Sequence, residues 1–362
     1  MIDALAAVGR AAGLDAVGVA AAVPFEGTRR DLEARKAQGL AADMAFTYRR
    51  PERSTDPGLA LPGAASLVVG ARSYAHEAAA VAGPRGPRPT GRVARYARHD
   101  HYAALRAGLE AIAAHLRGEG WRTRVLVDDN ALVDREAAVR AGLGWYGKSA
   151  NVLLPGRGSW FVLGSVVTDA PLAPADAPVA DGCGSCTRCL DGCPTGAIVA
   201  PGVVDARRCL AWLVQAPGTF PVEHREALGD RIYGCDDCQE VCPPNRRADR
   251  LEDGDAEPDG TVTTTTTATV DLLDLLDADD ATLLARHGRW YIADRDPRYL
   301  RRNALLALGN TADPADPAVH RAVERARAGG DDLLREHATW AAERLSARRR
   351  PAPVPVPVGV RR

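Results

Sequence analysis

All eight cysteines of the 362-residue chain fall in one stretch, between Cys183 and Cys242. The first four, in CGSCTRCLDGCP, have the spacing C-x2-C-x2-C-x3-C-P, which bacterial ferredoxins use to hold [4Fe-4S] clusters. Three thiolates spaced in this way wrap one iron–sulfur cube, whereas the fourth, turned away by the proline that follows it, reaches a second cube. The motif therefore predicts a second cluster that returns one cysteine to the first.

The second cysteine motif, CDDCQEVCP, begins at Cys235 and lacks its first cysteine, because Ile232 occupies the expected place. Cys209 is the only cysteine left to fill the vacancy. By the crossover rule one cluster takes Cys183, Cys186, Cys189 and Cys242, and the other takes Cys193, Cys209, Cys235 and Cys238. Two tetrahedral zinc sites or free buried thiols are the alternatives, but zinc pairs of C-x2-C need neither the third cysteine nor the Cys-Pro pair.

The composition is that of a globular protein, with 46% hydrophobic residues and 46 Lys+Arg against 47 Asp+Glu. It excludes a disordered tail or a histone-like basic binder, and the length predicts two or three domains. Asp3, Arg10 and Asp15 interrupt the stretch in which a signal peptide needs an unbroken apolar core. With no uncharged run of about 20 apolar residues, we expect a soluble, cytoplasmic protein, most simply a monomer.

Periodicity predicts a mixed α/β (α+β) domain over residues 1–175. Its expected helices are 1–12 and 102–116, the second with Asp100 as a possible N-cap. Its expected strands are 15–21, 67–70, 122–127 and 161–167. Residues 176–250, which hold the cysteines, are expected to form a ferredoxin-like domain.

The remainder of the chain changes character twice. Residues 251–280 contain ten acidic residues and no Lys or Arg, which predicts a linker or an exposed edge. Residues 281–348 carry helical periodicity at 299–308 and 333–345, which predicts an all-helical domain of paired, HEAT-like helices. The Pro- and Arg-rich tail, 349–362, is expected to be extended and mobile.

A ferredoxin needs no further 300 residues, so the α/β domain is expected to hold the electron acceptor. It has no G-x-G-x-x-G between a strand and a helix and no Walker A loop. Residues 127–169 instead combine glycine-dense turns with Trp145, Tyr146 and Trp160. Such glycines permit close backbone approach to a large planar ligand, and aromatic side chains give it apolar walls.

Several segments together resemble the epoxyqueuosine reductase family, cobalamin and iron–sulfur enzymes that modify transfer RNA. They are YRRPERSTDPGLALPGAASLVVGARSY, GRVARYARHDHY, LVDREAAVRAGLGWYGKSANVLL, GSWFVLG, YGCDDCQEVCPPN and YLRRNALLALGN. The resemblance implies a nitroreductase-like cobalamin-binding domain, a two-cluster insertion and helical repeats that help to hold the RNA. It also implies base-off cobalamin with no protein ligand below the metal, in keeping with the absence of D-x-H-x-x-G.

The resemblance assigns the role of proton donor to Asp134, in the segment LVDRE. Opening an epoxide expels an alkoxide, and its elimination as water requires a proton. A carboxyl packed against a corrin has its pKa raised by desolvation and so stays protonated near neutral pH. The structural alternative is that Asp134 caps the helix expected at 135–141.

The resemblance also implies cofactor contacts from Asp134 itself and from six other residues: Arg53, Tyr96, Lys148, Asn151, Ser159 and Trp160. For Trp160 the alternative is core packing, and for Lys148 it is a solvated surface charge. The family usually has Asp-Tyr-His where this chain has Asp100-His101-Tyr102, so neither His101 nor Tyr102 is given a role.

The implied reaction is the reduction of epoxyqueuosine to queuosine at the wobble position of transfer RNA, the last step of queuosine biosynthesis. An external low-potential donor feeds the clusters, which reduce cob(II)alamin to cob(I)alamin. Phosphate contacts are predicted for Arg295, Arg298, Arg301 and Arg302, with a solvated helix face as the alternative. The rival functions are a reductive dehalogenase, disfavoured by the missing twin-Arg signal and the basic helical C-terminus, and a non-catalytic ferredoxin module.

Overall fold

The computed structural model describes residues 2–75, 88–255 and 268–349. The chain divides into two compact units. Unit 1 comprises the segments 1–80, 93–216 and 233–268, and unit 2 comprises the segments 81–92, 217–232 and 269–362.

Unit 1 is built on a four-stranded sheet of order β1-β2-β7-β4, in which every neighbouring pair is antiparallel. The strands are β1 (Ala16–Ala21), β2 (Ser66–Ser73), β7 (Phe161–Thr168) and β4 (Thr123–Val127). The two central strands, β2 and β7, are almost wholly buried, because helices cover both faces of the sheet. The predicted α/β domain is confirmed.

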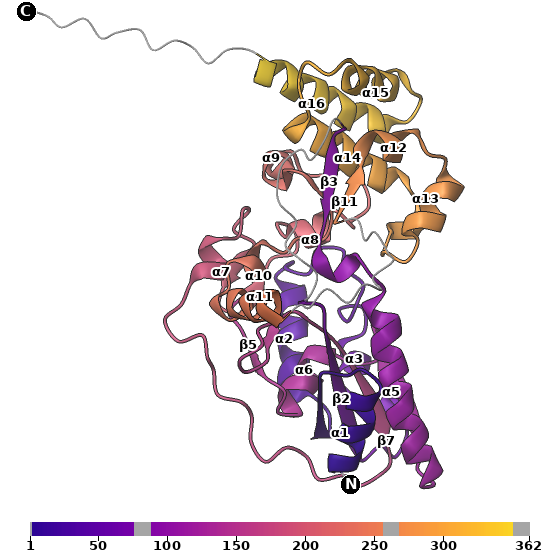
Figure 1. The fold of residues 1–362 in the computed structure, drawn as a ribbon, viewed down its shortest axis with the longest axis vertical. Coiled ribbons are helices and arrows are strands. Elements are labelled where there is room, and N and C mark those ends of the chain that lie inside the picture. Colours follow the sequence, from indigo (N-terminus) through magenta and orange to yellow (C-terminus); the bar gives the residue numbers. More distant parts are fainter. Residues whose placement is uncertain (1, 76–87, 256–267, 350–362) are drawn as a thin grey trace, which may run out of the picture. The chain divides into compact units, whose positions relative to one another are not determined.

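Helices lie over both faces of this sheet (Figure 1), and each face has its own hydrophobic core. Helices α1 (Ile2–Ala11) and α5 (His101–Gly118) cover one face, where Leu105, Leu109 and Ile112 are fully buried. Helix α6 (Asp134–Arg140) covers the other, with Ala137 and Ala138 in its core. The predicted elements are all present, and Asp100 caps α5 by accepting a 2.9 Å hydrogen bond from the backbone N–H of Ala103.

Short elements connect these layers and support the cysteine segment. Between β1 and β2 lie α2 (Glu26–Ala37), α3 (Pro51–Ser54) and α4 (Pro57–Ala60), and between α6 and β7 lie β5 (Trp145–Tyr146) and β6 (Val152–Leu153). The cysteine segment contains α7 (Arg188–Asp191), β8 (Ile198–Ala200), β9 (Val203–Val204), α8 (Leu210–Leu213), α10 (Asp237–Glu240) and α11 (Pro243–Asp255). Residues 176–216 and 233–250 belong to unit 1 with the sheet, so a separate domain for 176–250 stays a prediction.

Unit 2 contains most of a three-stranded sheet of order β10-β3-β11, formed by β10 (Arg231–Tyr233), β3 (Thr90–Val93) and β11 (Thr269–Asp271). Around it lie α9 (Arg225–Leu228), α12 (Leu272–Asp277), α13 (Asp280–His287), α14 (Arg298–Thr311), α15 (Pro317–Ala328) and α16 (Asp332–Arg349). Helix α14 packs against α12 and α16, and α15 packs against α16. The predicted C-terminal helical region is confirmed, while its HEAT-like pairing stays a prediction.

The prediction of a linker or an exposed edge over residues 251–280 is wrong for residues 272–277, which form α12. Asp271 accepts hydrogen bonds from the backbone N–H groups of Leu273 and Asp274 and so caps α12, and the buried face of α12 includes Leu272. A helix start with an apolar face packs into a core despite its acidic composition. Residues 256–267 and the predicted tail 350–362 lie outside the described residues. No helix in the described ranges is long and apolar enough to cross a bilayer.

Candidate active site

Asp134 is the first residue of α6, and its side chain does not cap that helix. The N-cap is Val133, which has extended backbone angles and no side-chain cap. The interpretation of Asp134 as an N-cap is therefore wrong. The start of the helix is held instead by a 2.9 Å backbone hydrogen bond from the Val133 N–H to the Ser54 carbonyl oxygen. The Asp134 carboxyl is therefore available for another role.

The Asp134 carboxyl lies in an environment that favours its protonated form. Desolvation raises the pKa of Asp134 well above its usual range, and the carboxylates of Asp128 and Asp129 raise it further. Arg135 opposes these effects but does not overcome them. Burial also raises the pKa of Asp128, which has a left-handed backbone with φ of 50°. Three clustered carboxyls disfavour a further negative charge, so Asp134 is suited to hold a proton.

Tyr102 is a phenol on which the charges of these carboxyls act. Burial raises the pKa of Tyr102, and the charges of Asp128 and Asp134 raise it further. His101 is buried and packs against Tyr74, with 5.6 Å between ring centroids. In the unusual order His101-Tyr102 the histidine is thus a core residue, and the partly buried tyrosine is the one that responds to the charge of Asp134.

Tyr146 and Asp134 both reach solvent although protein surrounds them. The exposed fraction of Tyr146 is 40%, yet desolvation raises its pKa. Asp134 is likewise only partly buried by surface area while desolvation dominates its pKa. Protein atoms therefore dominate the surroundings of both groups, although each keeps some contact with solvent. A carboxyl that favours its protonated form and still reaches solvent is suited to general acid chemistry on a bound ligand.

The predicted cofactor loop around Lys148 is tied to the cysteine segment. The Lys148 Nζ donates a 2.7 Å hydrogen bond to the Gly184 carbonyl oxygen, between Cys183 and Cys186. The Lys148 carbonyl accepts a 3.0 Å bond from the Gly202 N–H. Lys148 is therefore not a free surface charge. Asn151 is partly buried and accepts a bond from the Gly147 N–H through its carbonyl oxygen.

Ser159 and Trp160, predicted to contact the cofactor, are buried. The exposed fraction of Trp160 is 0%; its ring lies 5.8 Å from that of Tyr74, and the Arg95 guanidinium lies 4.2 Å from its centroid. Direct contact of Trp160 with a ligand is therefore wrong for this structure, and core packing is the observed role. Ser159 is held by a network with Asn245 and Gln239 of the cysteine segment.

Arg53 and Tyr96 occupy different surroundings. Arg53 is exposed on α3 and lines a pocket with Asn130, four residues before Asp134. Tyr96 is partly buried, and its hydroxyl accepts a bond of 3.5 Å from Gln215. A Cβ atom on Gly234 would lie 2.9 Å from the Tyr96 ring, so the residue before Cys235 has to be glycine for this close approach.

The eight cysteines are partly buried, none forms a disulfide, and their thiols fall into two groups. Burial raises the pKa of Cys242 to about 11, and the thiols of the first motif, Cys183, Cys189 and Cys186, raise it further. Burial likewise raises the pKa of Cys238, with added contributions from Cys235, Cys209 and Cys193. These two sets of neighbours are the sets that the crossover rule predicts.

Within the described ranges, no group of three or more His, Cys, Asp or Glu side chains is arranged to hold a metal ion directly. The assignment of two [4Fe-4S] clusters rests instead on the cysteine spacing, in which the third cysteine and the Cys-Pro pair are not needed by zinc sites of C-x2-C pairs. Cys193 also accepts a backbone hydrogen bond at its sulfur, from the Ala197 N–H at 3.2 Å.

Comparisons with known proteins agree with this geometry. The sequence model of the 4Fe-4S double cluster binding domain matches residues 182–245. The chain is 33% identical to the epoxyqueuosine reductase of Bacillus cereus over 335 residues, covering 91% of this chain and 85% of that one. It is 35% identical to the Vibrio cholerae epoxyqueuosine reductase over 309 residues, covering 84% and 81%. This chain belongs to the epoxyqueuosine reductase family.

Solved structures of epoxyqueuosine reductases share the whole fold. One holds an epoxyqueuosine-modified tRNA-Tyr stem loop; it is 30% identical with a TM-score of 0.79, covering 95% of this chain and 89% of that one. Another, from Bacillus subtilis, has its aspartate-bearing catalytic loop swung out of the active site; it is 31% identical with a TM-score of 0.80, covering 95% and 90%. Membership of the family decides against a dehalogenase or a ferredoxin module.

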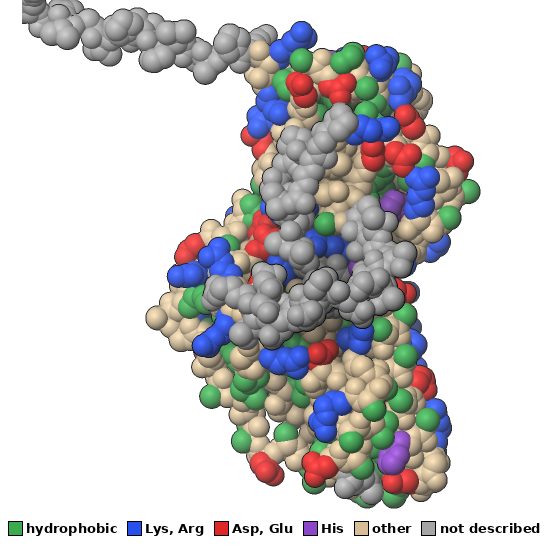
Figure 2. All heavy atoms as spheres, in the orientation of Figure 1, with side chains coloured by type: hydrophobic (Ala, Val, Ile, Leu, Met, Phe, Trp, Pro, Cys, Tyr) green, Lys and Arg blue, Asp and Glu red, His purple; other side chains and the backbone are tan. Residues whose placement is uncertain are grey.

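The four arginines predicted to contact RNA differ sharply in availability within unit 2. Arg302 is 0% exposed and donates a 2.6 Å hydrogen bond to the Gly218 carbonyl oxygen. The prediction that Arg302 contacts a phosphate is therefore wrong. Arg298 is paired with Asp296 and Asp331, and Arg301 with Asp280. Figure 2 shows acidic side chains interspersed with basic ones on the visible face of these helices. Arg295 is exposed with only a 3.3 Å bond to the Gly288 carbonyl, so it is the available member of the set.

Sequence reasoning missed the residues that surround Asp134. Tyr102 was left without a role, and Asp128, Asp129 and Arg135 were not singled out. Their proximity depends on tertiary packing at the end of β4, where Arg106 of α5 donates a 3.1 Å hydrogen bond to the Val127 carbonyl oxygen, next to Asp128 and Asp129. The only local signal was the density of acidic residues in VDDNALVDRE.

Proposed function

We propose that Asp134 is the proton donor in the reaction of this chain, the reduction of epoxyqueuosine in tRNA to queuosine, which is the final step of queuosine synthesis. Family membership over 91% of the chain establishes the reaction. The observation that supports the role of Asp134 is its desolvated carboxyl among other acids, which favours the protonated form. A carboxylic acid that keeps its proton near neutral pH delivers it to an alkoxide efficiently.

The reaction consumes two electrons and two protons and releases the epoxide oxygen as water, leaving an alkene. Asp134 gives one proton to the oxygen as the carbon–oxygen bond breaks, and solvent returns the proton to the carboxylate. Tyr102, on whose phenol the charge of Asp134 acts, would help to exclude bulk water from the acid. The second proton comes from solvent.

We propose that cobalamin binds beside Asp134 and the partly exposed ring of Tyr146, and when bound it would supply a low-valent cobalt nucleophile that passes both electrons to the substrate. Tyr146 would offer the corrin an apolar aromatic surface, and the glycine-dense backbone of 142–151 would permit its close approach. Asn151 and Lys148, which lie in that loop, would hold the amide side chains of the corrin. Ser159, Tyr96 and Arg53 are the other residues proposed to contact the cofactor. The lower face of the cobalt is proposed to have no protein ligand.

The two [4Fe-4S] clusters of the double-cluster domain deliver the electrons. We assign Cys183, Cys186, Cys189 and Cys242 to one cluster and Cys193, Cys209, Cys235 and Cys238 to the other, on the basis of their neighbours. The charge of Arg135 acts both on Cys209 and on Asp134. This shared neighbour favours the second cluster as the one that hands electrons to the active site.

The test is anaerobic reconstitution followed by mass spectrometry of nucleosides from epoxyqueuosine-containing tRNA after chemical reduction. The wild-type chain should remove the epoxide oxygen, and Asp134→Asn should not, while retaining cobalamin and the iron of both clusters. If Asp134→Asn converts substrate at the wild-type rate, Asp134 is not the donor. If the fully loaded wild-type chain leaves the epoxide intact, the assignment of the reaction itself fails.

A further inference from the structure

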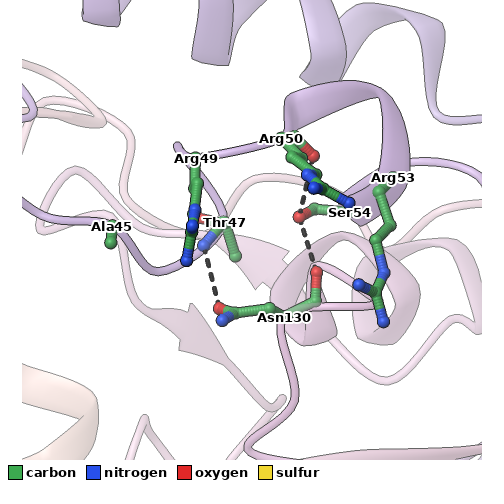
Figure 3. A pocket seen from close by; sticks show the side chains of 7 residues that line it. All are labelled: Ala45, Thr47, Arg49, Arg50, Arg53, Ser54 and Asn130. Atoms are coloured by element: carbon green, nitrogen blue, oxygen red, sulfur yellow. Dashed lines mark hydrogen bonds between the residues drawn. The ribbon is translucent and has the colours of Figure 1, made fainter.

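Three arginines surround one cavity in unit 1. The cavity has a volume of about 220 Å³, and Arg49, Arg50 and Arg53 line it together with Thr47 and Asn130. Figure 3 shows the arginines, which come from α3 and the turn before it, grouped with Asn130 around the hollow. No aspartate or glutamate is among the described residues that line it.

None of these three guanidinium groups has an ion pair or hydrogen bond within the described part of the chain. Other exposed arginines of unit 1 are neutralised: Arg122 pairs with Asp169 at 2.7 Å, and Arg157 pairs with Asp15 at 2.7 Å. The carboxylate nearest in sequence, Glu52, is not among the residues that line the cavity. Three like charges around one hollow repel each other unless an anion joins them.

The wall opposite the arginines is fixed to the Asp134 segment. The Asn130 Oδ1 accepts a 3.2 Å bond from the Thr47 N–H, so the amide is oriented, with its Nδ2 donors left for another partner. The Ser54 Oγ donates a 2.6 Å hydrogen bond to the Asn130 carbonyl oxygen. The Ser54 carbonyl oxygen accepts a 2.9 Å hydrogen bond from the Val133 N–H. The cavity and the carboxyl of Asp134 thus share one backbone segment.

We propose that this cavity is a phosphodiester-binding site, in which Arg49 and Arg50 hold the two non-bridging oxygens and Asn130 donates a further hydrogen bond. Guanidinium groups bind phosphate in this bidentate way, and a diester carries a single charge that three arginines overcompensate. The inference rests on the proposed function, because that function supplies two phosphodiesters: the nucleotide loop of cobalamin and the backbone of the tRNA. Either source anchors its ligand beside the Asp134 segment.

The test compares the full chain with the double variant Arg49→Gln/Arg50→Gln, which leaves Arg53 in place. Binding is measured without turnover for three probes: cobalamin, cobinamide, which lacks the nucleotide loop, and an anticodon stem-loop RNA. Arg10→Gln, an exposed arginine on α1, is the matched control, and iron content and melting temperature verify the fold. Arg49→Lys/Arg50→Lys retains the charge and should restore most of the binding.

If the site holds the cobalamin phosphodiester, the double Gln variant should bind cobalamin at least about tenfold more weakly and cobinamide as the wild type does. If the site holds RNA, stem-loop affinity should fall by a similar factor with a shallower salt dependence, and both corrinoids should bind normally. Wild-type affinity for all three probes would overturn the proposal. Because binding is read without turnover, a failure of the reaction with both ligands bound normally would count against the proposed function and not against this site.

Discussion

The backbone N–H of Ser159 donates a 2.6 Å hydrogen bond to the Oδ1 of Asn245. Asn245 is 0% exposed and in turn donates to the Ser159 Oγ and to the Gln239 carbonyl. Gly158 permits this approach, because a Cβ atom there would lie 2.1 Å from the same Oδ1. Ser159, two residues before β7, is thereby joined to α11, which begins directly after Cys242, so the sheet and the last cysteine of the second motif are held in a fixed position relative to each other.

Asn245→Ala should destabilise unit 1 and weaken iron binding. It leaves the buried Ser159 N–H without its acceptor, which costs roughly 1–3 kcal/mol, while the Gln239 carbonyl keeps its 3.1 Å bond from the Cys242 N–H. Unfolding by urea, with iron content measured in parallel, tests this prediction. Ser159→Ala is the matched control, since it removes only the hydroxyl contacts and should cost about 1 kcal/mol. Equal stability of Asn245→Ala and the wild type would show that the network does not hold this position.

Much of this architecture could be predicted from sequence because its signals are local. Cysteine spacing gave both clusters, and periodicity gave the strands and helices of the sheet with the cap at Asp100. The contact between Ser159 and Asn245 joins residues 86 positions apart and leaves no periodic trace. The motif around Trp160 predicts that its ring contacts a ligand, yet the ring is buried in the core beside the sheet.

The count of arginines in unit 2 led to a wrong prediction for Arg302 for a similar reason. The excess of arginine in the C-terminal region predicts phosphate contacts, but Arg302 folds inward, between 5 and 6 Å from the ring centroids of Phe220 and Tyr299. A buried guanidinium over aromatic rings stabilises the fold, and composition alone cannot distinguish such an arginine from one that contacts RNA. The packing of α14 against its neighbours shows which of these two roles Arg302 has.

Asp134→Asn should abolish conversion and also change the pH dependence of stability. The raised pKa of Asp134 means that the fold favours the protonated acid, so stability is present at low pH and is lost as pH rises through the folded value. The variant, which cannot ionise, should therefore gain stability relative to the wild type as pH rises. For the wild type, single-turnover rates should fall above the same pKa. A rate that rises with pH would exclude an acid role.

Removal of one cysteine from each proposed set should erase one cluster at a time. Cys209→Ser should lose the cluster that we assign to Cys193, Cys209, Cys235 and Cys238, which is one of the two cubes, and should stop turnover. Cys242→Ser should lose the other cluster, although it belongs to the same C-x2-C-x3-C motif as Cys235 and Cys238. Electron paramagnetic resonance of the reduced variants distinguishes the two. If Cys242→Ser and Cys235→Ser lose the same signal, the crossover assignment is wrong.

Arg295→Gln should weaken RNA binding and lower the slope of log affinity against log salt by about 1, as for one lost phosphate contact. Arg302→Gln should leave that slope unchanged and instead destabilise unit 2, because it removes the 2.6 Å bond to the Gly218 carbonyl. Fluorescence anisotropy with a stem-loop RNA at several salt concentrations measures both slopes. A change in slope for Arg302→Gln alone would reverse this assignment.

His337 should make unit 2 sensitive to acid. Its ring is fully buried, with Nε2 accepting a 3.1 Å bond from the Phe220 N–H and Nδ1 2.7 Å from the Leu333 carbonyl, an arrangement that requires the neutral ring. Desolvation lowers the pKa of His337 to about 4, with Arg225 and Arg302 lowering it and Glu336 opposing them. Because the folded pKa is depressed, the stability is present above the unfolded value of 6.5 and is lost as pH falls towards 4.

Hydrogen exchange of α16 as a function of pH measures this contribution. In the wild type the opening free energy should fall by up to about 3 kcal/mol more than in His337→Gln between about pH 7 and about pH 4. His320→Gln, a substitution of a partly exposed histidine in α15, should keep the wild-type pH dependence. Since the Phe220 N–H loses its acceptor whenever His337 gains a proton, the change should appear in exchange at Phe220 as well as in α16. Parallel pH curves for the wild type and His337→Gln would show that another group carries the acid sensitivity.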